Sequence, residues 1–442
     1  MKCSAGSIAL GLSALALIIA CSSTSVTTVP SDHDSSVGGQ QNLGGSSGNS
    51  AGGNSQGGSG SAQGSAGQGS CSVATTCAAG DFGGNRICGT GTCLSLLVSG
   101  AAHNCYVTNA GAVRCWGHGA YGQLGGGTLT SQLKPATIPN LANVVHIAAG
   151  GSHTCAVLAD KSLRCWGENT KGQVGDGTLS NASSPYNVSA ISNALRVATG
   201  DNHTCALLAD GTVKCWGANE SGQLGNGTLT DSTVPVLVSG ISNAIDVAAG
   251  DKHSCALLGN GALQCWGNNA TGQLGNGSTT SSQTPVSPAA PSAISWISVA
   301  AGTSTTCAVA SGGGTYCWGA NNNGQLGDGT SSNHNVPTVV LGLANAVDIV
   351  NSDSHECSLN SSATARCWGV NSYGQLGDGT TTNRNSPANV NALTDIRALS
   401  AGKLHTCAIS GSSVVSCWGY NGSGQLGTGT TTSSSLPVPV AM

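Results

Sequence analysis

Histidine and cysteine recur together along the chain, and both residue types are suited to metal or redox chemistry. In one copy His203 and Cys205 stand two positions apart, and Cys215 follows ten positions after Cys205. On one face of a hairpin these side chains would offer three zinc ligands, whereas the cysteines alone would form a disulfide. In another copy Thr305 replaces the histidine while both cysteines remain. The cysteine pair therefore does not depend on the histidine.

We predict a disulfide within each of the seven repeated cysteine pairs, with reduced core cysteines and a metal site as alternatives. The oxidising destination inferred below from the N-terminus favours disulfides. A three-residue hairpin loop with Gly211 in the left-handed conformation would pair Cys205 directly with Cys215, whereas a two-residue turn would put the sulfurs on opposite faces. Three copies replace this glycine and are less favourable: Lys161, Ala363 and Ser413. The predicted pairs are Cys105–Cys115, Cys155–Cys165, Cys205–Cys215, Cys255–Cys265, Cys307–Cys317, Cys357–Cys367 and Cys407–Cys417.

These residues belong to an internal repeat. The first cysteine of each copy falls at 105, 155, 205, 255, 307, 357 and 407, a step of 50 with one step of 52. Each copy holds short β-prone runs between Gly, Asn and Asp turn residues, such as 245–250, 254–258, 262–266 and, after a Gly-Gln-Leu-Gly segment, 234–238. This predicts an all-β, seven-bladed β-propeller of four-stranded blades over residues 94–442. The first copy lacks a preceding fourth strand, so we expect the C-terminal strand at 436–440 to complete that blade and close the ring.

Other residues recur in nearly every copy, and we expect them to be structural because a catalytic site is usually built once. The repeated histidines should hold strand to strand, and the repeated tryptophans should pack between blades. The histidines are His103, His153, His203, His253, His355 and His405; the tryptophans are Trp116, Trp166, Trp216, Trp266, Trp318, Trp368 and Trp418.

The pattern Cys-Trp-Gly-x4-Gly-Gln-[Leu/Val]-Gly is present in all seven copies. With the His-Thr and Asp-Gly elements, it resembles the regulator of chromosome condensation repeat, which reads Gly-x-x-His-Thr, Asp-Gly and Trp-Gly-x-Asn-x-x-Gly-Gln-Leu-Gly. The resemblance covers about 94–442 and implies a seven-bladed propeller. It implies less about function, because some members are guanine-nucleotide exchange factors for a nuclear GTPase and one exported bacterial type resembles a propeller that inhibits β-lactamase. The paired cysteines depart from the best-known members.

The N-terminus predicts export. Lys2 precedes an apolar run of 13 residues at 8–20, which indicates a signal peptide over residues 1–20. The sequence Leu-Ile-Ile-Ala-Cys at 17–21 resembles the lipobox of bacterial lipoproteins, which implies lipidation of Cys21; cleavage to a soluble product is the alternative. Ser22 after the cysteine is similar to the outer-membrane form of this signal. The chain is thus predicted to be exported and lipid-anchored, at a bacterial outer membrane or cell surface.

Two segments lie between the signal peptide and the propeller. Residues 21–70 carry the lipid anchor and a linker rich in Gly and Ser, which we expect to be a disordered tether. Residues 71–93 form a small Cys-rich segment, in which Cys71, Cys77, Cys88 and Cys93 allow three pairings.

Composition and motifs limit the function. Asp, Glu, Lys and Arg make up only 7% of the 442 residues, and the 14 basic residues are scattered singly, which argues against binding nucleic acid. Gly-x-Ser-x-Gly occurs only within the Gly- and Ser-rich linker, at 44–48, 48–52 and 53–57, where no nucleophile elbow between a strand and a helix is expected, and the P-loop and His-Glu-x-x-His motifs are absent. We therefore predict neither catalytic residues nor a metal or cofactor.

A binding surface is expected where the copies differ. Four variable residues separate Trp-Gly from Gly-Gln-Leu-Gly in each copy, and aromatic residues occur there only in copies six, seven and one. Ring closure makes these blades neighbours, so His118, Tyr121, Tyr373 and Tyr420 are predicted to form one binding patch. The alternative is that they cover local loops. Trp296, the one tryptophan outside the repeat pattern, is a second candidate or a packing residue.

These features favour a non-enzymatic cell-surface lipoprotein that acts as a protein-binding scaffold. The binding would inhibit or dock an exported enzyme. The propeller is expected to be a monomer anchored to the membrane by lipid. A glycan-binding propeller is the first alternative, supported by the Asn-rich inserts, and a lyase or hydrolase is the second. Nucleotide exchange on a GTPase is not expected, since export would separate the protein from such partners.

Overall fold

The computed structural model describes residues 88–89, 92–93, 96–290 and 294–442. The predicted signal peptide, Cys21, the linker, Cys71 and Cys77 lie outside these residues. Within the Cys-rich segment, β1 (Cys88–Gly89) and β2 (Thr92–Cys93) form an antiparallel hairpin that pairs the backbones of Cys88 and Cys93. In the described parts of the chain, no helix is long and apolar enough to cross a bilayer.

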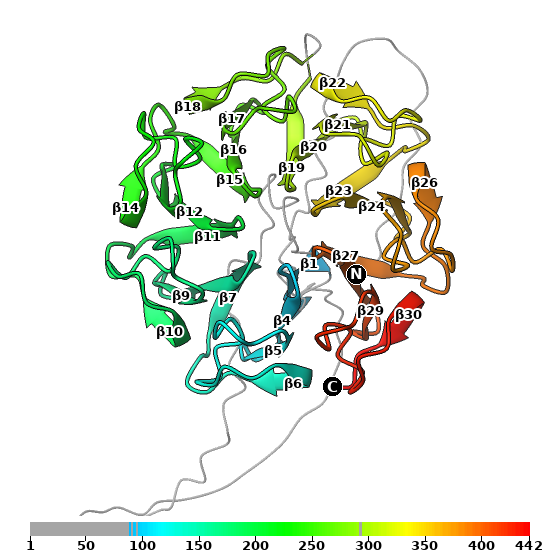
Figure 1. Ribbon diagram of the computed structural model, residues 1–442, viewed down its shortest axis with the longest axis horizontal. Helices are drawn as coiled ribbons and strands as arrows, with labels where there is room; N and C mark the ends of the chain where they lie inside the picture. Colours follow the sequence, from blue (N-terminus) through cyan, green and yellow to red (C-terminus); the bar gives the residue numbers. More distant parts are fainter. Residues whose placement is uncertain (1–87, 90–91, 94–95, 291–293) are drawn as a thin grey trace, which may run out of the picture. The chain divides into compact units, whose positions relative to one another are not determined.

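The strands from β3 to β30 form seven antiparallel sheets of four consecutive strands, ranged around a central axis (Figure 1). This confirms the predicted seven-bladed propeller. Blades 1 to 3 comprise β3 (Leu96–Ser99), β4 (His103–Val107), β5 (Val113–Gly117), β6 (Gln132–Thr137); β7 (Val144–Ala149), β8 (His153–Leu158), β9 (Leu163–Gly167), β10 (Ala182–Asn187); and β11 (Ala194–Thr199), β12 (His203–Leu208), β13 (Val213–Gly217), β14 (Ser232–Leu237). Blades 4 and 5 comprise β15 (Ala244–Ala249), β16 (His253–Leu258), β17 (Leu263–Gly267), β18 (Ser282–Val286); and β19 (Trp296–Ala301), β20 (Thr305–Ala310), β21 (Thr315–Gly319), β22 (His334–Val339). Blades 6 and 7 comprise β23 (Ala346–Asn351), β24 (His355–Asn360), β25 (Ala365–Gly369), β26 (Arg384–Asn389); and β27 (Ile396–Ala401), β28 (His405–Ser410), β29 (Val415–Gly419), β30 (Ser434–Pro439).

In each blade the first strand lies nearest the axis and the fourth lies at the rim, as Figure 1 shows for β7 and β10. The two middle strands form the hairpin that carries the cysteines, and in blade 3 Cys205 lies directly opposite Cys215. Gly211 in the connecting turn has φ +77°, so the three-residue loop predicted from the sequence is present. The structure joins the sulfurs of all seven predicted pairs in disulfides.

The three turns without glycine keep the same backbone. Lys161, Ala363 and Ser413 have φ 66°, 59° and 62°, in the left-handed region that a Cβ atom disfavours. The disulfides nearby form as in the other blades. The hairpin and its disulfide therefore hold these three residues in a backbone conformation that is unfavourable for non-glycine residues.

Replacing Lys161 by Gly should raise the free energy of unfolding by about 1 kcal/mol, because the left-handed conformation costs a non-glycine residue about 1–2 kcal/mol and glycine loses part of that gain as entropy. Gly211→Ala is the matched reverse change and should destabilise, since the new Cβ would also lie 2.8 Å from the Ser242 carbonyl oxygen. Urea unfolding of both variants measures the effect. A destabilised Lys161→Gly variant would show that the lysine side chain matters more than the backbone.

The repeated tryptophans fill the spaces between blades. Trp216 of blade 3 is fully buried in a cluster built mainly from blade 2, including Val174 and Ile191. Its Nε1 donates a hydrogen bond to the Gln173 carbonyl oxygen of blade 2 at 2.9 Å. The other six tryptophans make the equivalent bond to the preceding blade. The predicted inter-blade role of the tryptophans is confirmed.

The ring closes differently from our expectation in one respect. The C-terminal strand β30 pairs with β29 inside blade 7, and blade 1 is complete in itself from β3 to β6. Closure is instead a seam like the others: Trp116 Nε1 of blade 1 donates to the Gln425 carbonyl of blade 7 at 3.0 Å. Val438 and Val440 pack in the same cluster as Trp116. The C-terminal segment thus closes the ring by packing rather than by adding a strand to blade 1.

Candidate functional site

One face of the propeller carries all the variable inserts. In each blade the turn between the first and second strands and the loop between the third and fourth strands emerge on the same side, because the strands alternate in direction. Direct hydrogen bonds join them: the amides of His118 and Glu168 donate to the carbonyls of Ala102 and Ser152, both at 2.9 Å. We call this side the loop face. The hairpin turns that contain Gly211 and Lys161 lie on the opposite face.

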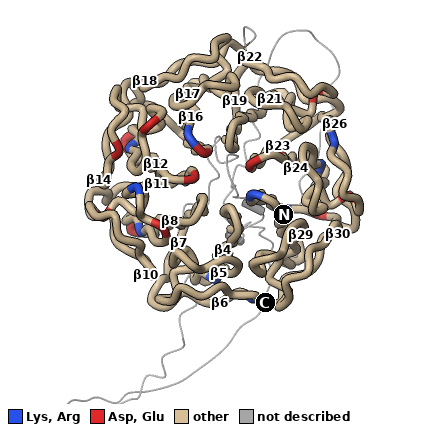
Figure 2. The backbone as a smooth tube through the Cα atoms, in the orientation of Figure 1, with Lys and Arg blue, Asp and Glu red and all other residues tan. Residues whose placement is uncertain are grey.

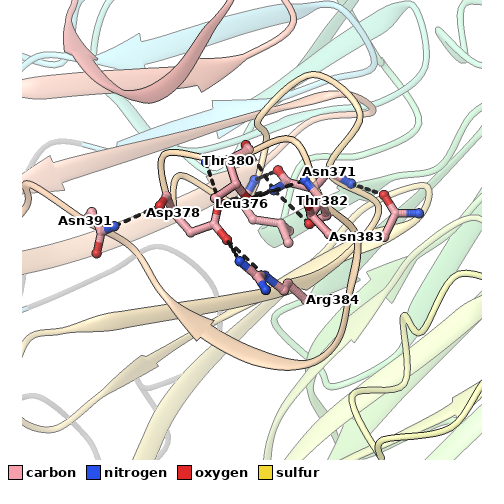
Figure 3. A network of polar contacts seen from close by, with 8 residues as sticks. All are labelled: Asn371, Leu376, Asp378, Thr380, Thr382, Asn383, Arg384 and Asn391. Carbon is pink, nitrogen blue, oxygen red and sulfur yellow. Dashed lines mark hydrogen bonds and ion pairs between the residues drawn. The ribbon is translucent and has the colours of Figure 1, made fainter.

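Each insert is fixed by two side chains of the repeat. The last insert residue donates its amide to the glutamine of Gly-Gln-Leu-Gly, as Tyr373 does to Gln375 Oε1 at 3.0 Å. The second insert residue is a fully buried asparagine in six blades. In Figure 3, Asn371 Oδ1 accepts from the Leu376 amide, and its Nδ2 donates to the Thr380 and Thr382 carbonyls. These asparagines hold the loop, so their side chains are not available to a glycan as the Asn-rich pattern had suggested.

The predicted binding residues occupy the outer positions of these fixed loops. The rings of Tyr373 and Tyr420, in blades 6 and 7, lie 4.8 Å apart in an edge-to-face contact. In blade 1, His118 and Tyr121 lie 5.8 Å apart. Tyr373 is 43% exposed and Tyr121 is 40% exposed. The structure therefore gives two ring pairs on three consecutive blades, and we call these four residues the aromatic sector.

Trp296, the other aromatic candidate, lies in the core. It is 4% exposed and contacts the rings of Tyr316 and Trp318. The ambiguity left by the sequence is resolved in favour of packing.

The repeated histidines join one blade to the next. His153 Nε2 lies 2.9 Å from Thr204 Oγ1 of the following blade, and that hydroxyl donates to the Gln173 carbonyl at 2.8 Å. The hydroxyl must then accept the histidine proton, so the network assigns the hydrogen to Nε2. Six seams have such a link at 2.8–2.9 Å: His103–Thr154, His153–Thr204, His203–Ser254, His253–Thr306, His355–Thr406 and His405–Asn104. Burial lowers the pKa of His153 to about 3, so this ring is neutral and structural at pH 7.

The seam between blades 5 and 6 is built differently, and the sequence analysis noted only half of the change. Thr305 replaces the histidine, and Glu356 replaces the threonine that it would contact. Thr305 Oγ1 lies 3.3 Å from Glu356 Oε1, while Oε2 is buried without a partner among the described residues. Burial raises the pKa of Glu356 well above its usual range. Comparing the copies at both positions would have revealed the exchange.

Restoring the common pair with Thr305→His and Glu356→Thr should stabilise the protein at pH 7 by about 1–3 kcal/mol, the usual cost of a buried unsatisfied polar group. The folded chain holds the Glu356 proton at pH values where the unfolded chain loses it. The contribution of Glu356 to the free energy of unfolding of the wild type therefore falls as the pH rises above about 4.3, the pKa of a glutamate in the unfolded chain. The double variant lacks Glu356, so its free energy of unfolding should not include this fall. Urea unfolding from pH 4 to 8 measures both. A double variant less stable than each single variant would contradict this assignment.

The axis of the propeller opens on the loop face as a small cavity of about 120 Å³. Charged residues from four blades line it: Asp201, Asp251, Asp353 and Lys403. Figure 2 shows acidic and basic positions around the centre of the ring. In the parts of the chain that the structure describes, no group of three or more His, Cys, Asp or Glu residues could hold a metal ion.

Comparisons with known proteins agree with this architecture. A family profile described as "RCC1-like domain" matches residues 143–442, and the "Regulator of chromosome condensation (RCC1) repeat" matches 110–157 and 95–123. No curated protein matches the sequence. The structure is similar to that of human WBSCR16, at 23% identity and a TM-score of 0.68, covering 75% of this chain and 95% of that one. It is also similar to Prp20p from Saccharomyces cerevisiae, at 22% identity and a TM-score of 0.68, covering 76% and 88%.

These two likenesses support the fold. The profile match extends over more than half of the chain, from blade 2 to the last strand. The chain belongs to the RCC1-like domain family.

Proposed function

We propose that this protein is a non-enzymatic scaffold, exported and lipid-anchored through Cys21, that binds an exported protein with the loop face of its propeller. The observation that carries the proposal is the contact between the exposed Tyr373 and the half-buried Tyr420 on adjacent blades. Tyrosines that present a rigid apolar ring and a polar hydroxyl are typical anchors of protein interfaces. His118 and Tyr121 form a second ring pair on the same face, in blade 1.

The way these rings are held supports a binding role. Each insert is tied to the blade through buried asparagine or glutamine side chains, so the rings sit on a rigid base. A rigid base lowers the entropy that is lost on binding. Similar structures point in the same general direction: Prp20p has binding properties to Gsp1p and histones, and another structure shows yeast RCC1 with Kap60 bound. Docking or inhibition of an exported enzyme is the form of binding that suits an anchored, exported chain.

Replacing Tyr121, Tyr373 and Tyr420 by Ala should abolish capture of the partner from intact cells without lowering the temperature of unfolding, because these side chains pack on the surface. The matched control replaces three exposed apolar residues of the opposite face by Ala: Leu195, Ile245 and Val414. Capture is measured by affinity purification under oxidising conditions, followed by mass spectrometry. Unchanged capture by the tyrosine variant would reject the site, and equal loss in both variants would show a nonspecific effect.

The anchor is tested in the same cells. Cys21→Ser should move the protein from the membrane fraction to the soluble fraction. A Cys21→Ser variant that stays in the membrane fraction would contradict lipid anchoring. Partner capture is measured on the same variant, so that the anchor and the binding face are tested separately.

A further inference from the structure

A pocket of about 240 Å³ lies where blade 1 meets blade 2, beside β10, the outermost strand of blade 2 (Figure 1). Blade 1 supplies the turn that ends the Gly-Gln-Leu-Gly segment and the residues that follow β6. Blade 2 supplies side chains from β9 and β10. No residue of the aromatic sector lines this pocket, so it is a separate feature of the molecule.

The turn in the pocket wall departs from the repeat. Directly after Gly-Gln-Leu-Gly or Gly-Gln-Val-Gly the other six copies have Asp, Asn or Thr, whereas the first copy has Gly126. A Cβ atom on Gly126 would meet no atom within 4 Å. The first copy thus leaves open space at the place where the other copies carry a polar side chain.

A second departure removes a backbone hydrogen bond from the same wall. In blades 3 to 7 an amide that follows the fourth strand donates to the last glycine carbonyl of Gly-Gln-Leu-Gly, as Ser239 does to Gly225 at 2.9 Å. In the first copy the residue equivalent to Ser239 is Pro139, which has no N–H group. The turn at Gly125 and the segment at Pro139 are therefore not joined by this bond, and both line the pocket.

Arg164 of β9 brings a positive charge whose donors the fold does not use. Its Nε is buried without a hydrogen-bond partner, and its terminal Nη groups, on a side chain that is only half-buried, also bond to no described residue. The equivalent arginine of blade 6, Arg366, is engaged: its Nε donates to Asn389 Oδ1 at 3.0 Å and its Nη1 to the Gly342 carbonyl at 2.8 Å. The guanidinium in the pocket is thus available to a ligand, unlike its counterpart in blade 6.

The other residues of the pocket complete an environment for an anion. Asn140 and Ser184 add neutral polar side chains that can donate hydrogen bonds. No Asp or Glu is among the lining residues. The nearest acid along the chain, Asp160, lies on an exposed turn, where Ser162 Oγ donates to it at 2.6 Å. A single cation therefore faces the pocket without a carboxylate to neutralise it.

We propose that this pocket binds a small organic acid, whose carboxylate pairs with the Arg164 guanidinium and whose apolar body lies against Pro139 and Pro185. The guanidinium fork matches a planar carboxylate through two parallel hydrogen bonds. One arginine compensates one negative charge, which suits a carboxylate better than the nearly doubly charged phosphate group. Pockets for drug-sized ligands have about 300–1,000 Å³, so this smaller one takes a small molecule. The site does not depend on the proposed function.

The test titrates the purified, oxidised chain with benzoate at pH 7.5 and low salt, and follows binding by ligand-observed NMR. Benzamide, which is neutral and nearly isosteric, should bind at least tenfold more weakly. Arg164→Gln should also weaken benzoate binding at least tenfold. The matched control, Arg366→Gln, removes the same charge from the equivalent strand position of blade 6 and should leave binding unchanged.

Gly126→Asp provides a second variant that the repeat itself tolerates, because three other copies have Asp at this position. It places a negative charge on the pocket wall, so it should weaken benzoate binding at least tenfold without lowering the temperature of unfolding. Four results would overturn the inference: no binding of benzoate, equal binding of benzamide, benzoate binding that is unaffected by Arg164→Gln, or unaffected by Gly126→Asp. Tighter binding of inorganic phosphate than of benzoate, lost in Arg164→Gln, would identify a phosphate site instead.

Discussion

Lowering the pH from 7 to 4 should unfold the propeller, with the temperature of unfolding dropping steeply below about pH 6. Burial lowers the pKa of five seam histidines to about 3 and that of His203 to about 4. In the unfolded chain their pKa returns to about 6.5. Between the folded and the unfolded pKa, the histidines are protonated in the unfolded chain but neutral in the folded chain. The free energy of unfolding therefore decreases as the pH falls.

The size of the effect follows from the number of histidines. Each contributes up to about 1.4 kcal/mol per pH unit within this window, and six act together. Buried acids oppose this effect within the same window, since burial raises the pKa of Asp348 to about 7 and that of Glu356 well above its usual range, so the folded chain keeps protons that the unfolded chain loses above about pH 4. The six histidines outweigh these acids, so stability should still rise with pH and peak near pH 7, where the histidines are neutral in both states.

Urea unfolding at several pH values measures the proton uptake. The matched variant is His253→Gln, in which the amide can still donate to Thr306 but cannot take up a proton at pH 4 to 6. Its slope of stability against pH should be smaller by about one proton. An unchanged slope would mean that the histidines are not the groups that drive acid unfolding.

Removing one hairpin disulfide should cost about 3 kcal/mol, and reducing all seven should unfold the protein. Each disulfide closes a loop with a sequence separation of 10, for which the chain-entropy estimate is about 3 kcal/mol. Domains have a total free energy of unfolding of only about 5–15 kcal/mol. The fully reduced chain therefore has little stability left.

The measurement compares urea unfolding of the wild type and of a variant with Cys205→Ala and Cys215→Ala. Reduction of the wild type is performed in urea, because the sulfurs are completely buried, and refolding is then followed by circular dichroism with and without reductant. The double alanine variant should shift the midpoint, and the reduced wild type should not refold. A reduced chain that regains the native spectrum and stability would contradict this account of the disulfides.

Repetition explains what the sequence could predict. Seven copies with one cysteine spacing and one turn pattern determine the hairpin register, and the structure pairs Cys205 with Cys215 as that register requires. The repeat does not determine where one blade ends and the next begins, because a circular pattern can be divided at any strand. We therefore assigned the strand at 436–440 to blade 1, whereas it belongs to blade 7.

The candidate sites show the same limit. The sequence placed His118, Tyr121, Tyr373 and Tyr420 in equivalent loops, and the structure adds which rings touch. The carboxylates at the axis could not be predicted in this way. The charged residues that line the axis are 50, 102 and 50 residues apart along the chain, and only the closure of the ring brings them around one cavity.

The claim that the loop face binds a protein partner is tested most directly by site-specific photocross-linking in intact cells. A photoreactive amino acid replaces Tyr373 on the loop face in one strain and Val414 on the opposite face in another; both positions are more than 40% exposed. We predict one discrete cross-linked protein from position 373 and none from position 414. A cross-linked partner from position 414 alone would place the interface on the opposite face and contradict the account.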